Sequence, residues 1–506
     1  MRPQNWRSTA PSLIVFIALL SILLKTDALA QQWSPPTRIH VGVGLYPALL
    51  VRGDTLHTAY TATLGGQTKI FYVRSCDSGS SWNEAIVLND TIDYRRAYYA
   101  RFLTNGARLM ALWYEMTQDV SQLGYVAYSI STNGGQTWSA PQHALDPGLF
   151  LVYLFSAASV DSTVNVIYSK EVYPRMGFFI VRSTNFGRTW SSPRELFRCQ
   201  ETSLMDMEAY GDTFHFVWSG NFVQGVNWEV YYIRSQDQGL NWTEPETLTT
   251  PGDRGARFPA LSINETGSMA LCWMDFGDSP PGWIADIFFA RSTNQGVNWF
   301  GEQELTFLHL DGNPDIFYRA DMIHVTFERH DIPIREIWYM QSTDNGLTWG
   351  EETELDLDPA DSHEPRVAYS NGKAYVIWAD DRDNPDTIHY GGLYFSYCPY
   401  EPNAVSEGGN IPKTFSLKVY PNPFNSSTSI TYSNLKGGEI RIFDIEGQLI
   451  RTFFTGGENE GRIKWDATDA SGKTVSSGIY FARAQYGSKA TAASQSSTCV
   501  KLIYLK

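Results

Sequence analysis

The sequence contains few of the residues that build metal centres and redox sites. Its 506 residues include nine histidines and five cysteines, which are scattered without metal-ligand spacing: Cys76, Cys199, Cys272, Cys398 and Cys499. An odd number of cysteines leaves at least one thiol unpaired within the chain, and the sparse spacing does not suggest a fold that depends on disulfides. We therefore predict that most cysteines are small buried apolar residues, and that the protein needs no metal or other cofactor.

Common catalytic motifs and an excess of positive charge are missing as well. The sequence has no Ser-His-Asp order, nucleophile elbow, zinc motif or phosphate-binding loop. Its 39 Lys and Arg face 54 Asp and Glu, which gives a formal net charge of −15. Because a nucleic-acid partner would require a basic stripe, this balance argues against nucleic acid and against polyanions in general.

Long apolar runs are confined to the N-terminus. Arg2 and Arg7 precede an apolar stretch at residues 13–24, and Ala28-Leu29-Ala30 resembles a cleavage site. These features predict a signal peptide at residues 1–30, with an uncleaved anchor as the alternative. No later segment is long enough to span a membrane, so we predict an exported protein without a transmembrane span in the mature chain.

An octet that returns six times organises most of the chain. The copies begin at Ser75, Ser131, Ser183, Ser235, Ser292 and Ser342, and each has Asp or Asn two residues on, Gly four on and Trp seven on. The acidic or amide side chain can bind backbone N–H groups of a turn, the glycine can take positive φ, and the tryptophan can anchor the returning strand. We predict structural roles for the twelve residues Asp77, Asn133, Asn185, Asp237, Asn294, Asp344, Trp82, Trp138, Trp190, Trp242, Trp299 and Trp349.

These octets resemble the Asp-box, or BNR, repeats of the sialidase superfamily of β-propellers. The resemblance covers residues 33–398 and implies an all-β propeller. It does not imply sialidase activity, because many propellers that carry the Asp box are not sialidases. Half of the copies also carry Asn where a catalyst would need a carboxylate.

The number of strand-like runs predicts seven propeller units rather than six. The second strands are expected near residues 55–60, 109–113, 163–168, 213–218, 269–273, 322–327 and 374–378, and the seventh unit lacks an octet. Residues 32–39 read like the segments that follow the octets, so we expect this first strand to complete the last sheet and close the ring. We predict a seven-bladed β-propeller over residues 31–398, with six blades as the alternative because the known sialidases are six-bladed.

The composition changes after Cys398. Residues 399–413 read as a linker, and residues 414–506 as a small immunoglobulin-like β-sandwich. Residues 417–425, 440–447, 472–481 and 501–506 resemble the C-terminal sorting domain of type IX secretion substrates. This resemblance implies a partnership with the type IX secretion machinery and a secreted or outer-membrane-surface location in a Bacteroidota-like bacterium. An ordinary immunoglobulin-like module is the alternative.

A sialidase-like active site needs three arginines, an acid/base Asp and a Tyr nucleophile polarised by Glu. The first arginine belongs to an Arg-Ile-Pro motif, but this chain has Leu45-Tyr46-Pro47 in its place. The nearest substitute is Arg257, which is followed by Asp275 and Asp286 as catalytic candidates. Two further arginines lie after the matching Pro position of other units, at Arg101 and Arg366, and strand alternation directs them away from the side that Arg257 faces. We therefore expect arginines that bridge neighbouring blades, and whether the protein is an enzyme stays open.

A binding site requires less. The residues just before each first strand are expected to line the mouth of the central channel: Tyr46, Tyr98, Tyr99, Tyr153, Asp206, Arg257, Asn313, His363 and Glu364. Aromatic rings mixed with polar groups suit sugars, which stack their apolar faces and form hydrogen bonds at their edges. We predict an extracellular recognition module that binds glycans. The alternatives are a sialidase-like glycoside hydrolase and a protein-binding surface propeller.

Calcium is the one cofactor that the sequence leaves open. The acidic run Asp380-Asp381-Arg382-Asp383-Asn384-Pro385-Asp386 groups carboxylates, but it lacks the Gly and the distal Glu of an EF-hand loop. We expect a solvated acidic hairpin there. His57, His215 and His324 fall within second strands, where we expect packing rather than catalysis.

Overall fold

The computed structural model of the chain divides into two compact units, Met1–Glu401 and Pro402–Lys506. The residues described in it are 33–40, 44–64, 66–89, 95–117, 124–144, 152–223, 227–249, 255–276, 285–307, 309–331, 334–356, 360–382, 391–399, 416–433, 438–444, 449–455, 460–470, 472–486 and 498–505. The predicted signal peptide lies outside the described residues, and so do residues 400–413 of the predicted linker. The regular elements of the described residues are strands β1 to β35, without a helix.

Seven four-stranded antiparallel sheets are described in the first unit. From the inner strand outward, three of them are β2 (Leu45–Arg52), β3 (Thr55–Leu64), β4 (Gln67–Ser75) and β5 (Ile86–Val87); β6 (Arg95–Asn105), β7 (Arg108–Thr117), β8 (Gly124–Ser131) and β9 (Gln142–His143); and β10 (Val152–Val160), β11 (Thr163–Val172), β12 (Arg175–Ser183) and β13 (Arg194–Cys199). The next three are β14 (Glu201–Tyr210), β15 (Thr213–Asn221), β16 (Glu229–Ser235) and β17 (Glu246–Thr247); β18 (Ala256–Ile263), β19 (Met269–Asp275), β20 (Asp286–Ser292) and β21 (Phe300–Glu304); and β22 (Asp311–Arg319), β23 (Met322–Asp331), β24 (Ile334–Ser342) and β25 (Thr353–Glu354). The last is β26 (Ser362–Ser370), β27 (Lys373–Asp380), β28 (Gly392–Pro399) and β1 (Thr37–His40).

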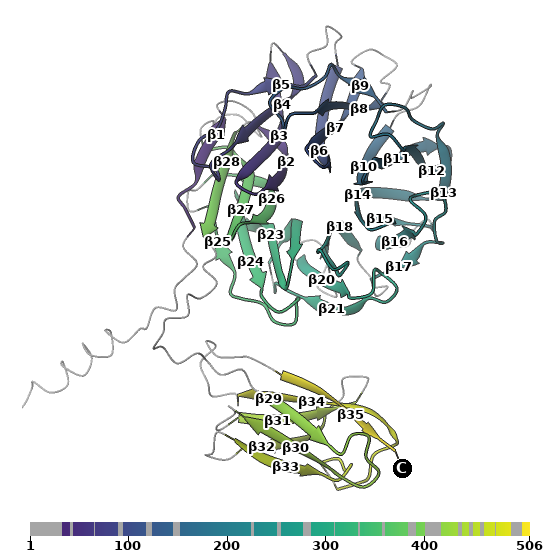
Figure 1. Cartoon of the computed structure of the whole chain (residues 1–506), viewed down its shortest axis with the longest axis vertical. Helices are drawn as coiled ribbons and strands as arrows, with labels where there is room; N and C mark the ends of the chain where they lie inside the picture. The colour runs from purple at the N-terminus through teal and green to yellow at the C-terminus, as the bar shows by residue number, and fades with distance from the viewer. Residues whose placement is uncertain are drawn as a thin grey trace, which may run out of the picture. The chain divides into compact units, whose positions relative to one another are not determined.

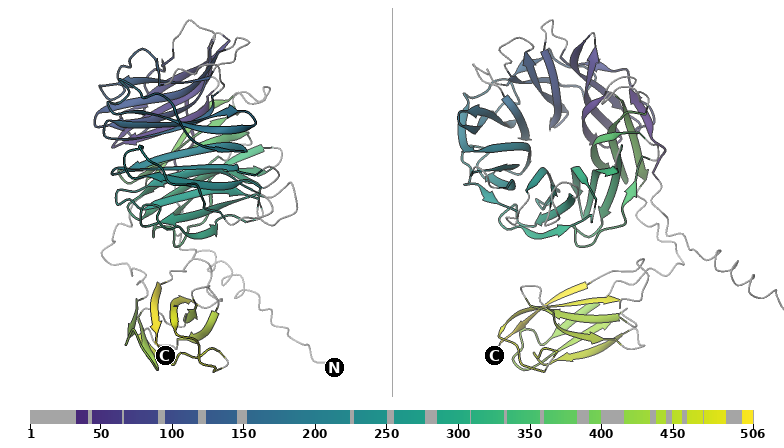
Figure 2. Two further views of the ribbon diagram at one scale, coloured as in Figure 1. Left: turned by 90° about the vertical axis from the view of Figure 1, so that its right-hand side faces the viewer. Right: turned by 180° about the vertical axis from the view of Figure 1, so that it is seen from behind.

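These sheets form a closed ring around a central axis, the arrangement of a β-propeller (Figure 1). Each inner strand contacts the inner strand of the next sheet, and β26 contacts β2. The view from behind shows the same closed circle (Figure 2). Every residue of β15 is buried, because a neighbouring sheet covers each face of its own sheet. The apolar core is therefore divided into layers between adjacent sheets, such as the cluster that joins Leu112 of β7 to Val166 of β11.

The ring is closed by the pairing of two distant segments. β1 pairs with β28 in the register Thr37↔Phe395, so the first described strand completes the last sheet, as expected from the sequence. Trp33, just before β1, packs its ring edge-on against Tyr339 of β24, at 4.7 Å between centroids. Octet tryptophans meet the preceding sheet in the same way, as Trp349 does with Phe289 at 5.0 Å.

The second unit contains two antiparallel sheets that share one apolar core. The strands of the first are β29 (Ser416–Tyr420), β30 (Thr428–Ser433) and β33 (Glu460–Trp465); those of the second are β32 (Leu449–Phe454), β31 (Gly438–Phe443), β34 (Gly478–Tyr486) and β35 (Thr498–Tyr504). Trp465 of β33 meets Tyr480 of β34 edge-on, with centroids 5.2 Å apart, and both belong to the buried cluster. The two sheets therefore pack face to face.

The cysteines whose surroundings are described follow the expectation with one exception. Cys199, Cys272 and Cys398 are buried free thiols, whereas Cys76 is exposed. Burial raises the pKa of all three buried thiols, so they behave as apolar core residues.

Candidate functional site

Each octet folds into a turn that its own side chains hold. Ser342 Oγ accepts a hydrogen bond from the N–H of Gly346 at 2.8 Å and donates one to Asp344 Oδ1 at 2.8 Å. The same carboxylate oxygen accepts the N–H of Thr348 at 2.8 Å. In the second octet, Asn133 Oδ1 accepts from Ser131 Oγ and from the N–H of Thr137, both at 2.9 Å. The amide oxygen performs the same task as the carboxylate, which explains why Asp and Asn alternate without a change of structure.

The inner strands carry backbone irregularities that the sequence did not reveal. The register of every inner strand shifts near its start. Five non-glycine residues take positive φ at these bulges: Tyr46 (51°), Tyr99 (56°), Phe258 (55°), Asn313 (46°) and Glu364 (58°). A bulge re-aims a side chain, and strained backbone persists only where the surrounding structure holds it. Pro follows four of these five residues, so a recurrent X-Pro pair accompanies the bulges in the sequence.

Four of the bulge residues line a cavity of about 160 Å³ at the start of the inner strands, which we call the mouth cavity. They are Tyr46, Tyr99, Phe258 and Asn313. The rings of Tyr46 and Tyr99 lie 4.3 Å apart between centroids, and Tyr99 is 37% exposed, so the aromatic wall is accessible. Burial raises the pKa of both phenols, which are therefore neutral.

Charged residues form the floor of the mouth cavity. In the five sheets whose bulge residue has positive φ, the position two residues after it is occupied by Ala48, Arg101, Ala260, Asp315 and Arg366, while Ser156 and Asp206 follow the register shifts of β10 and β14. Three of these residues are small, and the four charged ones line the mouth cavity. The same four also line a second cavity of about 440 Å³ farther along the inner strands. They therefore separate two chambers of the central channel.

Arg101 spans the channel. Its Nη1 lies 2.5 Å from Asp206 Oδ1, and its Nη2 lies 2.5 Å from the carbonyl oxygen of Met207 and 3.2 Å from Glu208 Oε1. The expectation that Arg101 bridges neighbouring blades was wrong, because β14 lies two sheets beyond β6. The intervening strand β10 has the small Ser156 at the equivalent position, and this leaves room for the long side chain. Burial raises the pKa of Glu208 to about 7, although Arg101 opposes this shift.

Asp315 of β22 and Arg366 of β26 are the other two charged residues of the floor, on neighbouring sheets. Asp315 Oδ2 accepts the N–H of Val367 at 2.8 Å. Burial raises the pKa of Asp315 to about 6, even though Arg366 and that N–H act in the other direction. Arg366 donates from Nη1 to the carbonyl oxygen of Pro365 at 2.7 Å. The floor thus combines a carboxyl group that titrates near neutrality with a guanidinium group.

The proposed catalytic trio lies elsewhere. Arg257 stacks on Trp228 with 4.6 Å from its guanidinium carbon to the ring centroid, and is not among the described residues that line the mouth cavity. Asp275 and Asp286 are cross-strand neighbours at the end of their sheet. Asp275 accepts the Nε1–H of Trp273 at 3.3 Å, and Asp286 accepts the hydroxyl of Thr306 at 3.4 Å. Arg257 therefore packs on Trp228 and is absent from the described lining of the mouth cavity.

Of the other residues predicted at the rim, Tyr46, Tyr99, Asp206 and Asn313 line the mouth cavity, whereas Tyr98, His363 and Glu364 do not appear in the described lining. Tyr153 belongs to β10, but its side chain lies outside the described residues. Sequence reasoning missed Asp315 as part of the site and left Arg101 and Arg366 outside it. Their spacing two residues after the bulge was the available signal.

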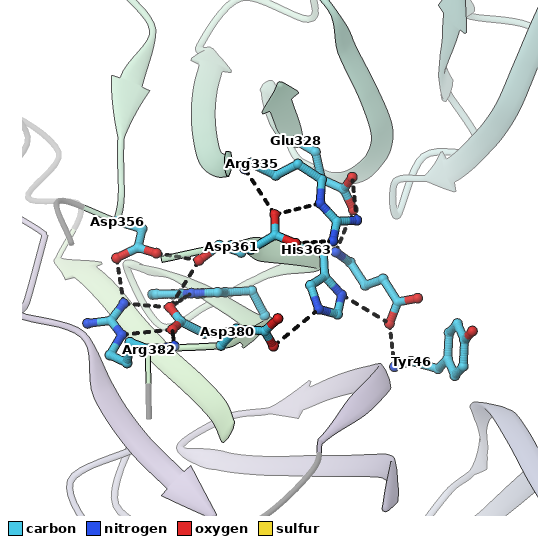
Figure 3. Close-up of polar contacts among 12 residues, drawn as sticks. Tyr46, Glu328, Arg335, Asp356, Asp361, His363, Asp380 and Arg382 are labelled. Carbon is cyan, nitrogen blue, oxygen red and sulfur yellow. Dashed lines mark hydrogen bonds and ion pairs between the residues drawn. The ribbon is translucent and has the colours of Figure 1, made fainter. Parts of the chain in front are cut away.

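His363 and Glu364 lie directly behind the mouth cavity, in a network of charged groups that joins β23, β24, β26 and β2 (Figure 3). Glu364 Oε2 accepts the N–H of Tyr46 at 2.5 Å, and the N–H of Glu364 donates to Glu328 Oε1 at 2.6 Å. Arg335 binds Asp361 through Nε at 2.8 Å. The network therefore supports the backbone of Tyr46 from behind.

The expectation of a solvated acidic hairpin was wrong at its first two residues. Asp380 is fully buried and accepts the Nε1–H of Trp378 at 3.1 Å and Nε–H of Arg382 at 2.9 Å. Asp381 is buried as well. Burial and the neighbouring Asp380 raise the pKa of Asp356 to about 6. Residues 383–390 lie outside the described residues, and the described part of the chain contains no group of three or more acidic, His or Cys residues arranged to hold a metal ion.

Comparisons with known proteins identify the tail of the chain. Residues 418–495 match the model of the secretion system C-terminal sorting domain. No curated protein matches the chain. Within the described residues, no helix has the length and apolarity needed to cross a membrane.

Several solved structures are similar to the first unit. A Hadza microbial sialidase has 16% identity and a TM-score of 0.40, over 56% of this chain and 63% of its own. A PL25 polysaccharide lyase, an ulvan lyase, has 12% identity and a TM-score of 0.49, over 72% of this chain and 95% of its own. The α-L-arabinanase of Penicillium chrysogenum has 13% identity and a TM-score of 0.44, over 73% and 99%. These values carry no argument about activity.

The sorting domain gives the chain its destination and one partner, the type IX secretion machinery. Its place at the C-terminal end agrees with the resemblance seen in the sequence, and the propeller precedes it in the chain. The chain thus carries a β-propeller followed in sequence by a type IX secretion sorting domain, and is secreted to the cell surface or the medium.

Proposed function

We propose that the propeller recognises a glycan in its mouth cavity. The observation that carries this proposal is the combination of an accessible aromatic wall, Tyr46 and Tyr99, with a polar floor in one cavity. Sugar rings stack on aromatic faces and form hydrogen bonds with carboxylate, guanidinium and amide groups. Asp206, Asp315 and Arg366 supply such groups at the floor.

The state of Tyr46 supports recognition over sialidase-like hydrolysis. A nucleophilic tyrosine requires a glutamate that polarises its phenol. Here the Glu364 carboxylate binds the backbone N–H of Tyr46 instead, and burial raises the pKa of the phenol. Tyr46 is therefore suited to stacking and hydrogen bonding rather than to attack.

The proposal includes the finer architecture of both units. We infer that the seven described sheets are seven blades, since Trp33 takes the place of an octet tryptophan in the sheet that lacks an octet. We also infer an immunoglobulin-like sandwich for the second unit from its three-stranded and four-stranded sheets.

A glycan array probed with the whole mature protein tests the proposal. Tyr99→Ala should weaken retention of the bound glycan about fivefold or more, because an aromatic stacking contact contributes roughly 1 kcal/mol or more. Phe300→Ala is the matched control, since Phe300 is a 51% exposed ring on the outer strand β21 and should leave retention unchanged. If the wild-type protein retains no glycan, or if both variants behave alike, glycan recognition at this cavity is wrong, and a protein ligand becomes the next candidate.

Glycoside hydrolysis is the second candidate, favoured by one observation. Asp315 has a pKa raised to about 6, while Asp206 in the same cavity is paired with Arg101. The two carboxyl groups therefore have different environments, as the two carboxyl groups of a glycosidase do when one acts as the acid and the other as its partner. A panel of fluorogenic glycosides, sialosides included, tests this idea. Turnover by the wild type that disappears in Asp315→Asn would establish the enzyme, and no turnover on any substrate would leave recognition alone.

A further inference from the structure

A chain of hydrogen bonds ties three bulge residues together behind the mouth cavity. Glu328 Oε1 accepts the Nδ2–H of Asn313 at 2.8 Å and the N–H of Glu364 at 2.6 Å. Glu364 Oε2 in turn accepts the N–H of Tyr46 at 2.5 Å. Asn313, Glu364 and Tyr46 belong to β22, β26 and β2, so the chain runs through three consecutive sheets and crosses the ring closure. Two of these three residues line the mouth cavity, and the shape of the cavity depends on the chain.

His363 lies next to this chain and is 5% exposed at its side chain. Its Nδ1 is 4.0 Å from Glu364 Oε2, and its Nε2 is 3.9 Å from Asp381 Oδ1 (Figure 3). These distances suit ion pairs and are too long for hydrogen bonds. Nε2 and Oδ1 are both buried without a hydrogen bond to a described residue, so charge alone links His363 to both carboxylates.

The groups around His363 are unequal in charge. Its own strand β26 and the turn before it supply Asp361, Glu364 and Arg366, and the end of β27 supplies Asp380, Asp381 and Arg382. From β23 comes Glu328, with His330 3.4 Å from that carboxylate. Arg335 belongs to β24, and Tyr46 to β2.

Two of the cations already have close partners. Arg335 is bound to Asp361 at 2.5 Å, and Arg382 is bound to Asp380 at 2.6 Å. Arg366 faces the floor beside Asp315. The carboxylates within 4 Å of His363 are those of Glu364 and Asp381, and a protonated imidazole is the cation that faces both, whereas Glu328 has Arg335 Nη1 at 3.9 Å.

Burial would lower the pKa of His363, but Asp381, Glu364 and Glu328 together raise it above the usual value of 6.5. The direction of this pKa shift determines how the stability of the folded arrangement depends on pH. A raised histidine pKa stabilises the folded arrangement fully at pH values below 6.5, and this stabilisation is lost as the pH rises through the higher folded value.

We propose that protonation of His363 regulates the mouth cavity. The imidazolium holds Glu364 in place, and Glu364 holds the Tyr46 backbone at positive φ. Loss of the proton loosens this side of the mouth and releases the ligand. Once the proton is lost, the buried Glu364 carboxylate faces Glu328 and Asp381 without its imidazolium partner and keeps only the Coulombic attraction of Arg335 and Arg366. Repulsion and desolvation then favour entry of water between β26 and β2. The part that concerns ligand release rests on the proposed function; the part that concerns Tyr46 does not.

Hydrogen exchange of the whole protein, followed by mass spectrometry over a pH series and corrected for intrinsic rates, tests the mechanism without a ligand. The segment that contains Tyr46 should exchange about tenfold faster above the pKa of His363 than below it, the order expected when a charge-assisted hydrogen bond loses its charge partner. The segment that contains Tyr99 is the internal control, because it has an equivalent bulge but no bond to Glu364. In His363→Gln the Tyr46 segment should exchange fast at every pH. Equal protection of both wild-type segments over the whole series would overturn the proposal, and this result does not depend on whether the variant folds.

Glycan retention at two pH values separates the inference from the proposed function. Wild-type retention should fall about tenfold between pH 6 and pH 8.5, and His363→Gln should show weak retention at both. A pH-dependent Tyr46 segment without retention of any glycan would refute glycan recognition and leave the coupling of His363 to the mouth intact. Retention that is equal at both pH values would refute the regulation while leaving glycan recognition in place.

Discussion

The ring of Trp33 packs edge-on against Tyr339 at 4.7 Å, and this contact joins the start of the described chain to the third strand of the sixth sheet. Octet tryptophans occupy the matching places in other sheets, as Trp138 does against Tyr72 at 4.9 Å. Trp33 therefore performs the anchoring task of an octet for the one sheet whose outer strand comes from the other end of the chain.

Trp33→Ala should destabilise the ring at its closure by about 3 kcal/mol, because the lost side chain leaves a cavity against the Tyr339 ring. Denaturant unfolding of the whole protein measures the change. Trp33→Phe keeps an aromatic edge and should cost less than half as much. Equal effects of the two substitutions would contradict the packing role.

Two adjacent glycines of the second octet give a matched pair. Gly134 and Gly135 both have positive φ, at 66° and 81°. A Cβ on Gly134 would meet nothing within 4 Å, whereas one on Gly135 would lie 1.9 Å from the hydroxyl oxygen of Tyr72. Gly134→Ala should therefore cost about 1 kcal/mol of backbone strain, and Gly135→Ala a further 1 to 3 kcal/mol, roughly, from overpacking. Unfolding free energies of the two variants that agree within error would argue against the close approach.

The fold was accessible from the sequence because its determinants are local and repeated. The octet spacing, the strand-like runs between the octets and the likeness of residues 32–39 to post-octet segments sufficed to predict the propeller and the completion of its last sheet by the first strand. The tail was recognised from motifs that lie within single strands and turns. In both cases, residues close in sequence determine the structure.

Three buried histidines predict a loss of stability in acid. His57, His215 and His324 each lie within hydrogen-bond distance of a tyrosine hydroxyl, at 2.8, 2.7 and 2.6 Å. Burial lowers their pKa values to about 4, 3 and 3. Because a lowered histidine pKa means that the unfolded chain binds the proton more tightly, stability is complete above pH 6.5 and falls as the pH drops below it.

Between pH 6.5 and pH 5 each histidine should contribute a loss of about 2 kcal/mol, since one pKa unit corresponds to 1.36 kcal/mol. His324→Gln keeps a hydrogen-bonding side chain but cannot titrate, so its unfolding free energy should fall by about 2 kcal/mol less than that of the wild type over this interval. A variant whose pH dependence matches the wild type would exclude His324 as a source of the acid sensitivity.

The site was less accessible from the sequence than the fold. Tyr46, Tyr99, Asp206 and Asn313 were predicted at the mouth and line the mouth cavity. Arg257 was misplaced and Asp315 was missed. Strand alternation alone fails there, since a bulge in each inner strand shifts the register after it. Contacts across the channel, such as Arg101 with Asp206, join strands about a hundred residues apart and leave no local pattern.

The Arg101 contacts give the last prediction. Arg101→Met leaves the carboxylates of Asp206 and Glu208 inside the channel without their shared cation, and we expect a destabilisation of about 2 kcal/mol at pH 8. The loss should be smaller at pH 5.5, because the pKa of Glu208 is raised to about 7 by burial and would rise further without Arg101, so that its protonation removes one unpaired charge from the channel. Arg198→Met is the control: the side chains of Arg198 and Glu195 are 43% and 37% exposed, whereas those of Arg101 and Asp206 are 26% and 15% exposed, and a surface pair contributes about 0.5 kcal/mol or less at either pH. Unfolding free energies at both pH values decide the question, and a loss for Arg101→Met that is independent of pH would mean that Glu208 does not contribute to it.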